Sequence, residues 1–92
     1  MRIVLRDKAL ADIRRIAEFI ASDSPAAARS VANEIFDAID DLEPFPNRFA
    51  KGRAPPTREH QVPGLPYAIV YEPGTNDRPS IVVAVFHTSQ NR

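Results

Sequence analysis

The sequence contains no cysteine, and only three of its 92 residues are glycine. Without cysteine, the chain cannot carry a disulfide framework, a thiolate metal site or a cysteine nucleophile. Its glycines, Gly52, Gly64 and Gly74, are too far apart to form a glycine-rich phosphate-binding loop. Several common kinds of functional site are therefore excluded at the outset.

Long apolar runs and an excess of one charge are also absent. No stretch approaches the roughly 18–20 apolar residues that span a membrane, and the opening MRIVLRDKAL lacks the apolar region of a signal peptide. Lys and Arg number 12, as do Asp and Glu. There is thus no overall basic field to attract nucleic acid or a membrane surface, and we expect a cytoplasmic protein.

The composition is that of a globular protein, at 43% hydrophobic and 26% charged residues. We expect residues 1–92 to form a single domain with one modest core. A chain of this size buries only roughly 60–65% of the surface that it exposes when unfolded. A partner that covers the remaining apolar surface would therefore matter to this protein.

Two segments show the apolar spacing of amphipathic helices. The apolar face of the first, KALADIRRIAEFIASDS, consists of Leu10, Ile13, Ile16, Ala17 and Ile20. We expect the carboxylates of Asp12 and Glu18 to face solvent. Ser24 is a suitable N-cap, and Pro25 a suitable first residue, for a second helix, AAARSVANEIFDAIDDL. Pro44 ends this helix, and the two helices form a hairpin.

Four segments have the apolar or β-branched character of strands. They are RIVL near the N-terminus, an edge strand from Thr57 to Val62, YAIVY, and SIVVAVF near the C-terminus. The last two predict a hairpin at the centre of a sheet, with helices covering one face and something else covering the other. The predicted fold class is α+β: an N-terminal strand, a helical hairpin and a three-stranded antiparallel sheet, in the order β-α-α-β-β-β.

A block of acidic residues lies at the end of the second helix, and a block of basic residues lies in the proline-rich connector that follows it. The acidic block is Asp37, Asp40, Asp41 and Glu43, and the basic block is Arg48, Lys51, Arg53 and Arg58. A solvated surface explains both blocks. Alternatively, the acidic block receives a basic segment of a partner protein.

No local motif for catalysis or metal binding stands out. His60 and His87 would meet only if their strands were neighbours, and a metal would need a further ligand, for which Glu59 and Glu72 are candidates by proximity alone. The serines near His87 do not define a nucleophile and its base. We therefore expect no metal and no cofactor.

Taken in order, the segments resemble the ParE/RelE toxin superfamily, and more closely its ParE branch. The likeness covers almost the whole chain. It includes the first helix with its Phe19-Ile20 pair, the second helix with its Leu-x-x-Phe-Pro end (Leu42, Phe45, Pro46), the basic loop NRFAKGR, and the sheet segments TREHQVPGLPYAIVYE and SIVVAVFHTSQNR. The conjunction of these elements carries the resemblance.

The resemblance implies the toxin of a type II toxin–antitoxin pair, with a helical hairpin packed on an antiparallel sheet. ParE-like members inhibit DNA gyrase by protein–protein contact and are not enzymes. The resemblance also implies a ParD-like antitoxin, encoded beside the toxin, that covers its exposed apolar grooves. Contact with DNA would then be indirect, through the antitoxin.

RelE-like members of the superfamily are ribosome-dependent mRNA endonucleases that use Lys, Arg and a C-terminal Tyr. This chain departs from that set, because Ala68 takes the place of an Arg and no aromatic residue follows His87. As an alternative function, an endonuclease would depend on Arg58, His60, His87 and Arg92. A further alternative is a non-toxic interaction module of the same fold.

The candidate partner-binding residues are Arg58, Tyr67, Tyr71, His87, Arg92, Asp37 and Asp41. Each also has a purely structural interpretation: an ion pair for Arg58, packing for the tyrosines, a hydrogen bond to the backbone for His87 and a loose chain end for Arg92. Tyr67 and Tyr71 are four residues apart in one strand and therefore share a face. We expect the antitoxin to cover the apolar surface around them.

Overall fold

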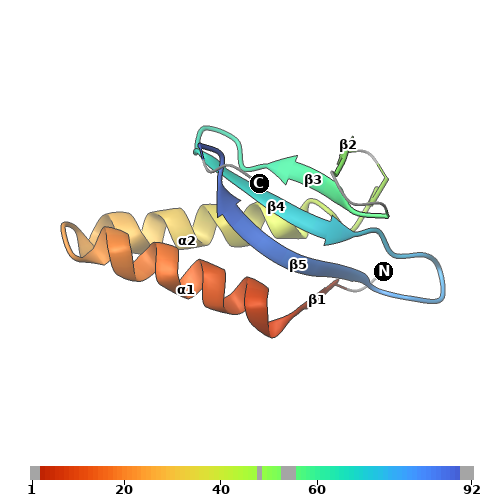
Figure 1. Cartoon of the computed structure of the whole chain (residues 1–92), viewed down its shortest axis with the longest axis horizontal. Coiled ribbons are helices and arrows are strands. Elements are labelled where there is room, and N and C mark those ends of the chain that lie inside the picture. Colours follow the sequence, from red (N-terminus) through yellow and green to blue (C-terminus); the bar gives the residue numbers. More distant parts are fainter. Residues whose placement is uncertain (1–2, 48, 53–55, 90–92) are drawn as a thin grey trace.

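A helical hairpin packs against one face of a five-stranded sheet in the computed structural model (Figure 1). The structure describes residues 3–47, 49–52 and 56–89. Its elements are β1 (Ile3–Leu5), α1 (Asp7–Ala21), α2 (Pro25–Asp40), β2 (Ala50–Lys51), β3 (Arg58–Gln61), β4 (Tyr67–Glu72) and β5 (Ser80–His87). Arg92, a candidate contact residue, lies outside the described residues, as do Arg48 and Arg53.

The α+β class is confirmed, but the sheet is larger than predicted. Its strand order is β1-β5-β4-β3-β2, with β4 and β5 paired at the centre as expected. β1 pairs with β5 in parallel, from Ile3 opposite Ser80 to Leu5 opposite Val82. The two-residue β2 pairs with β3, so β3 is not an edge strand. The predicted three-stranded antiparallel sheet is present as β3, β4 and β5, and the structure adds β1 and β2 to it. The sequence did not predict these additions, because β1 pairs with a strand on the far side of the helical hairpin and β2 is too short to show a pattern.

Local sequence signals set the start of α2. Ser24 has an extended backbone, and its hydroxyl accepts a hydrogen bond from the Ala27 amide at 3.1 Å. Pro25 is the first helical residue, as predicted. Neither described helix is long and apolar enough to cross a membrane.

The core lies between the hairpin and the inner face of the sheet. Ile13 of α1, Ile35 of α2 and Ile69 of β4 are among its buried residues. Tyr71 belongs to it too: its side chain is 0% exposed, and its hydroxyl donates a hydrogen bond to the Pro46 carbonyl. This placement corrects the expectation that Tyr71 presents partner-facing surface, since the folded chain has already covered it.

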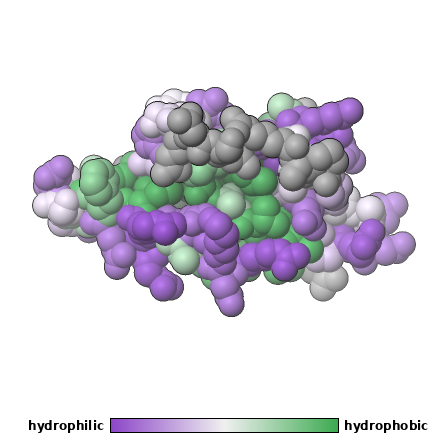
Figure 2. Space-filling view, in the orientation of Figure 1, coloured by the Kyte–Doolittle hydropathy of each residue, from purple (hydrophilic) through white to green (hydrophobic). Residues whose placement is uncertain are grey.

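The opposite face of the sheet has no helix over it in the described structure (Figure 1). Strand pairing places Val4 on this face beside Ile81, and Phe86 beside Ala68. Val4 is an exposed residue, and Phe86 is half-buried. Figure 2 shows a band of hydrophobic residues along β5, bordered by hydrophilic residues of α1. Apolar surface thus remains on the folded chain.

Candidate functional site

A buried carboxylate joins α1 to β5. The Asp12 side chain is only 3% exposed and accepts hydrogen bonds from Lys8 at 2.8 and 3.1 Å, from Arg15, and from the Val85 amide at 3.0 Å. The helical spacing explains its position, because Ala9, Asp12 and Ile13 lie on the same buried side of α1. The expectation that Asp12 faces solvent is therefore wrong.

The environment of Asp12 keeps it charged. Burial acts to raise the pKa of this carboxyl group, but hydrogen bonds from Lys8, the Val85 amide and Arg15, together with the charge of Lys8, outweigh burial. The pKa of Asp12 is consequently lowered from its ordinary value. A full set of donors therefore stabilises the ionised form inside the protein.

His87 and Tyr67 occupy one end of the sheet. They are paired across β4 and β5, and their rings meet edge to face with centroids 5.4 Å apart. The side chain of Ser89 lies 2.7 Å from His87 Nδ1, and the Ser89 amide donates to the same nitrogen at 3.1 Å. Tyr67 is 9% exposed. His87, half-buried, is therefore the more accessible of the two.

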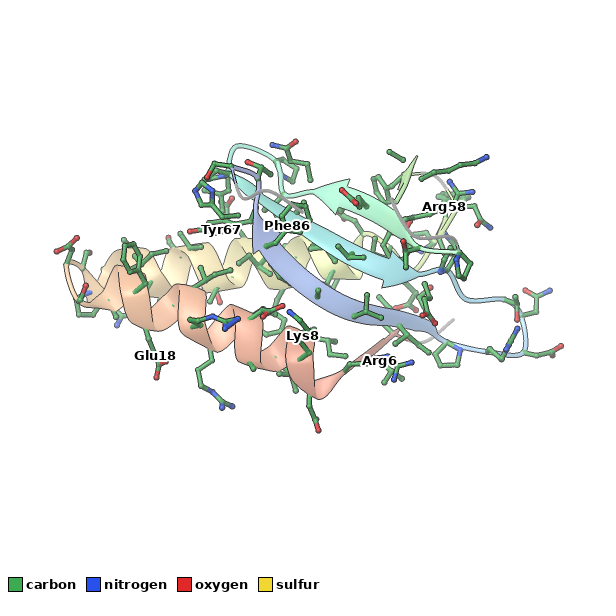
Figure 3. The ribbon with its side chains drawn as sticks, viewed as in Figure 1. Arg6, Lys8, Glu18, Arg58, Tyr67 and Phe86 are labelled. Atoms are coloured by element: carbon green, nitrogen blue, oxygen red, sulfur yellow. The ribbon has the colours of Figure 1, made fainter. Side chains whose placement is uncertain are left out.

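Arg58 lies at the other end of the sheet (Figure 3). It is half-buried, and its guanidinium donates a hydrogen bond to the Phe49 carbonyl at 2.8 Å. Arg58 also lines a cleft of about 470 Å³, together with Lys51, Thr57 and residues 73–75. Part of the predicted basic block therefore converges here.

His60 is buried between these two ends. Its ring stacks on Phe49, with centroids 3.7 Å apart and planes at 22°. Its Nε2 lies 3.8 Å from a carboxylate oxygen of Asp41, an exposed residue at the end of α2. Asp37 is likewise exposed on α2. The acidic candidates thus reach the surface, whereas His60 packs inside.

The candidate endonuclease residues do not form one cluster. Arg58 pairs with Tyr71 and His87 pairs with Tyr67, so their places along β4 are four positions apart. At about 3.3 Å per residue, that separation is about 13 Å along the strand. β4 also lies between the strands of His60 and His87, which are consequently not neighbours. Among the described residues, no group of three or more His, Asp or Glu side chains is suited to hold a metal.

Sequence reasoning missed the cluster of Lys8, Asp12 and Arg15. One signal was present: the three residues are spaced by four and three, so they share one side of a helix. Asp12 also falls between Ala9 and Ile13, which are buried. A carboxylate placed on an apolar helix face and flanked by two cations is a pattern that predicts a buried ion pair.

The chain matches the family model of the ParE toxin of the type II toxin–antitoxin system parDE over residues 3–92. The chain belongs to the ParE toxin family. The match spans nearly the whole sequence, so both the helical hairpin and the sheet belong to the ParE domain. No curated protein matches the chain at a significant level.

A solved structure supports the ParE fold independently of sequence. A chain from the chromosomal ParDE toxin–antitoxin system of P. aeruginosa superposes with a TM-score of 0.83, covering 95% of each chain. The two sequences are only 16% identical. Conservation of the ParE architecture at such low identity means that the side chains of the site must be judged from this chain itself.

Proposed function

We propose that this ParE-family chain acts in the cytoplasm as a toxin that binds and inhibits DNA gyrase, that it is not an enzyme, and that a ParD-like antitoxin neutralises it. The observation that carries the proposal is the separation of Arg58 from His87 by about 13 Å along β4. Binding requires only a complementary surface, whereas cleavage of RNA requires converging groups.

Cleavage of RNA without a metal needs a cation and a proton-transfer group within hydrogen-bond reach of one phosphate. Arg58 and His87 are too far apart to act on the same phosphate. The burial of His60 against Phe49 removes a third member of the endonuclease set. The described residues therefore favour the binding mechanism over the catalytic one.

Partner contacts under this proposal come from the candidates that reach the surface. Asp37 and Asp41 are exposed, and Arg58 and His87 are half-buried. Charged groups at the rim of an interface set specificity and association rate more than affinity. We therefore assign these residues to partner selection, with the mostly buried Tyr67 packed against His87. Arg92, outside the described residues, stays a candidate contact on the strength of the sequence alone.

The first prediction concerns the target. Purified protein added in excess to DNA gyrase should stop the supercoiling of relaxed plasmid, because the toxin occupies the enzyme. Supercoiling measured on agarose gels provides the readout. The same amount of protein, first mixed with its ParD-like antitoxin, should leave supercoiling intact and serves as the matched control.

Two results would favour the alternatives. Cleavage of mRNA on translating ribosomes that is lost in His87→Ala would establish an endonuclease and overturn the proposal. An absence of growth arrest when the toxin is induced without its antitoxin would instead point to a non-toxic interaction module.

A further inference from the structure

β5 extends well beyond the strand that pairs with its outer side. β1 covers only Ser80 to Val82, and the Arg6 amide makes the last contact, with the Val82 carbonyl at 3.0 Å. The chain then turns away into α1. On the side facing away from β4, residues 83–87 of β5 consequently have no strand beside them among the described residues. We refer to this side of residues 83–87 as the open edge.

The hydrogen-bond pattern shows which backbone groups point out of the open edge. The Thr88 amide donates to the Pro66 carbonyl, and the Tyr67 carbonyl accepts from Val62. Antiparallel pairs alternate between bonded and non-bonded positions. His87 opposite Tyr67 is therefore a non-bonded pair, and the amide and carbonyl of His87 point away from β4.

Val85 has the same outward orientation, which its contact with Asp12 confirms. Its amide donates to Asp12 at 3.0 Å, so this donor is already satisfied. The outward orientation takes the Val85 carbonyl and both backbone groups of His87 out of the β4–β5 ladder. Among the described turns, loops and caps, no backbone hydrogen bond involves these three groups. Past the Val85 amide, which Asp12 already binds, the open edge thus offers one donor and two acceptors to an incoming strand, all at its His87 end.

The surroundings of the open edge are positively charged. A cleft of about 330 Å³ separates β5 from α1, and its α1 wall includes Lys8, Asp12 and Arg15. The side chains of Lys8 and Arg15 are 69% and 71% exposed, whereas Asp12 is buried between them. Figure 3 shows Lys8 between α1 and β5. The α1 wall of the cleft therefore carries two positive charges and one negative charge, and the negative charge is buried.

We infer that the open edge is a docking site for an extended, acidic segment of the antitoxin, which adds to the sheet as a further strand. This inference rests on the proposed function, since it assigns the site at which the proposed partner binds. The incoming backbone would accept from the His87 amide and donate to the outward carbonyls. Main-chain bonding would supply affinity, and the flanking side chains would supply selectivity.

The two faces of the sheet define the sequence of that segment. Residues placed beside Val85 or His87 point to the α1 side, where Lys8 and Arg15 lie. Residues placed beside Phe86 point to the face that no helix covers. The segment should therefore alternate acidic and apolar side chains, whichever direction it runs.

The same charges explain why the edge does not pair indiscriminately. Natural sheets often carry a lysine or an inward-pointing charge at an edge, and such charges prevent unwanted strand addition. Lys8 and Arg15 repel basic segments, and Asp12 occupies one of the edge amides. An acidic segment removes the electrostatic penalty, so the edge selects a partner of that charge.

The backbone test compares His87→Pro with His87→Ala in binding to the full-length ParD-like antitoxin, measured by calorimetry. Both variants lose the imidazole, but only proline lacks the outward amide, and that amide makes no bond to β4. We expect His87→Pro to bind at least about tenfold more weakly than His87→Ala. Equal affinities in folded variants would overturn the inference.

If His87→Pro does not fold, hydrogen exchange of the His87 amide in the wild-type toxin, measured with and without antitoxin, tests the same contact. Antitoxin binding should slow exchange of the His87 amide by at least about tenfold. An unchanged rate, with binding intact, would overturn the docking site while leaving the proposed function standing. If the antitoxin does not bind at all, both fail.

The charge test uses Lys8→Gln/Arg15→Gln, with Arg14→Gln as the matched control on the same helix. The double variant should bind the antitoxin roughly tenfold more weakly and lose most of its salt dependence. Arg14 does not line the cleft at β5 and should have no more than about a twofold effect. Equal effects of the two sets of changes would contradict an acidic segment at this edge.

Discussion

Asp12 is the residue on which the contact between α1 and β5 depends most directly. It is the buried acceptor for two cations of its own helix and for a backbone amide of β5. Lys8 and Arg15 extend into solvent, so their charges remain available while their bonds to Asp12 hold them over the cleft. One side chain thus serves both the core and the proposed docking site.

At this scale we predict the effect of Asp12→Asn. The free energy of unfolding at pH 7 should fall by about 2–3 kcal/mol, because the variant loses charge-assisted hydrogen bonds and leaves buried donors poorly matched. Urea denaturation followed by circular dichroism would measure the change. Asp23→Asn, at an exposed position in the turn between the helices, should change stability by less than about 0.5 kcal/mol.

The pH dependence of the same variant has a definite sign. Folding lowers the pKa of Asp12, so its stabilisation is fully present above its unfolded pKa of about 3.9 and disappears as the pH falls through the folded value. The difference between wild type and Asp12→Asn should therefore be largest above about pH 5 and shrink below about pH 4. A difference that grew on acidification would contradict this assignment.

At the scale of elements, the helical hairpin depends on a well-formed start to α2. The Ser24 hydroxyl satisfies the Ala27 amide, one of the donors that the first turn leaves without an intrahelical partner. Helices of this length draw most of their stability from packing, so the cap adds to a helix that the sheet already supports.

We predict that Ser24→Ala lowers the free energy of unfolding by about 1 kcal/mol, because the cap is lost. Ser30→Ala makes the same chemical change on an exposed position within α2. It should leave stability unchanged or raise it by about 0.5 kcal/mol, since alanine is the better helix former. Thermal unfolding of both variants provides the measurement, and equal losses would argue against a capping role.

At the scale of the whole molecule, the two helices cover one face of the sheet, and no helix of the described residues covers the other (Figure 1). The hairpin seals the inner face, while Val4, Phe19 and Phe45 remain exposed elsewhere. A chain of 92 residues cannot bury all of its apolar surface. Its stability should consequently respond strongly to a partner that binds only the native state.

We predict that antitoxin at 100 times its dissociation constant raises the free energy of unfolding by about 2.7 kcal/mol. For a domain of this size, the unfolding midpoint should rise by roughly 10–20 °C. Differential scanning calorimetry over a range of antitoxin concentrations would measure it. An unfolding midpoint that does not change with antitoxin concentration would show that the antitoxin does not bind the folded toxin. Serum albumin at the same mass concentration serves as the control for crowding.

The sequence alone determined both helices, the Ser24 cap, the central pair of β4 and β5, and the family resemblance. These features depend on short-range periodicity and capping, which neighbouring residues specify. Membership of the ParE family follows from the same information, because the family match depends on the sequence and on the order of its segments.

Only the tertiary structure decided how distant segments meet. In it, β1 pairs in parallel with β5 after the chain has passed through the helical hairpin. Tyr71 is buried and its hydroxyl donates to the Pro46 carbonyl, and Asp12 accepts from the Val85 amide. Val85 lies 73 residues from Asp12. No local pattern encodes such a contact, because a carboxylate gains by leaving water only when packing delivers donors from another element.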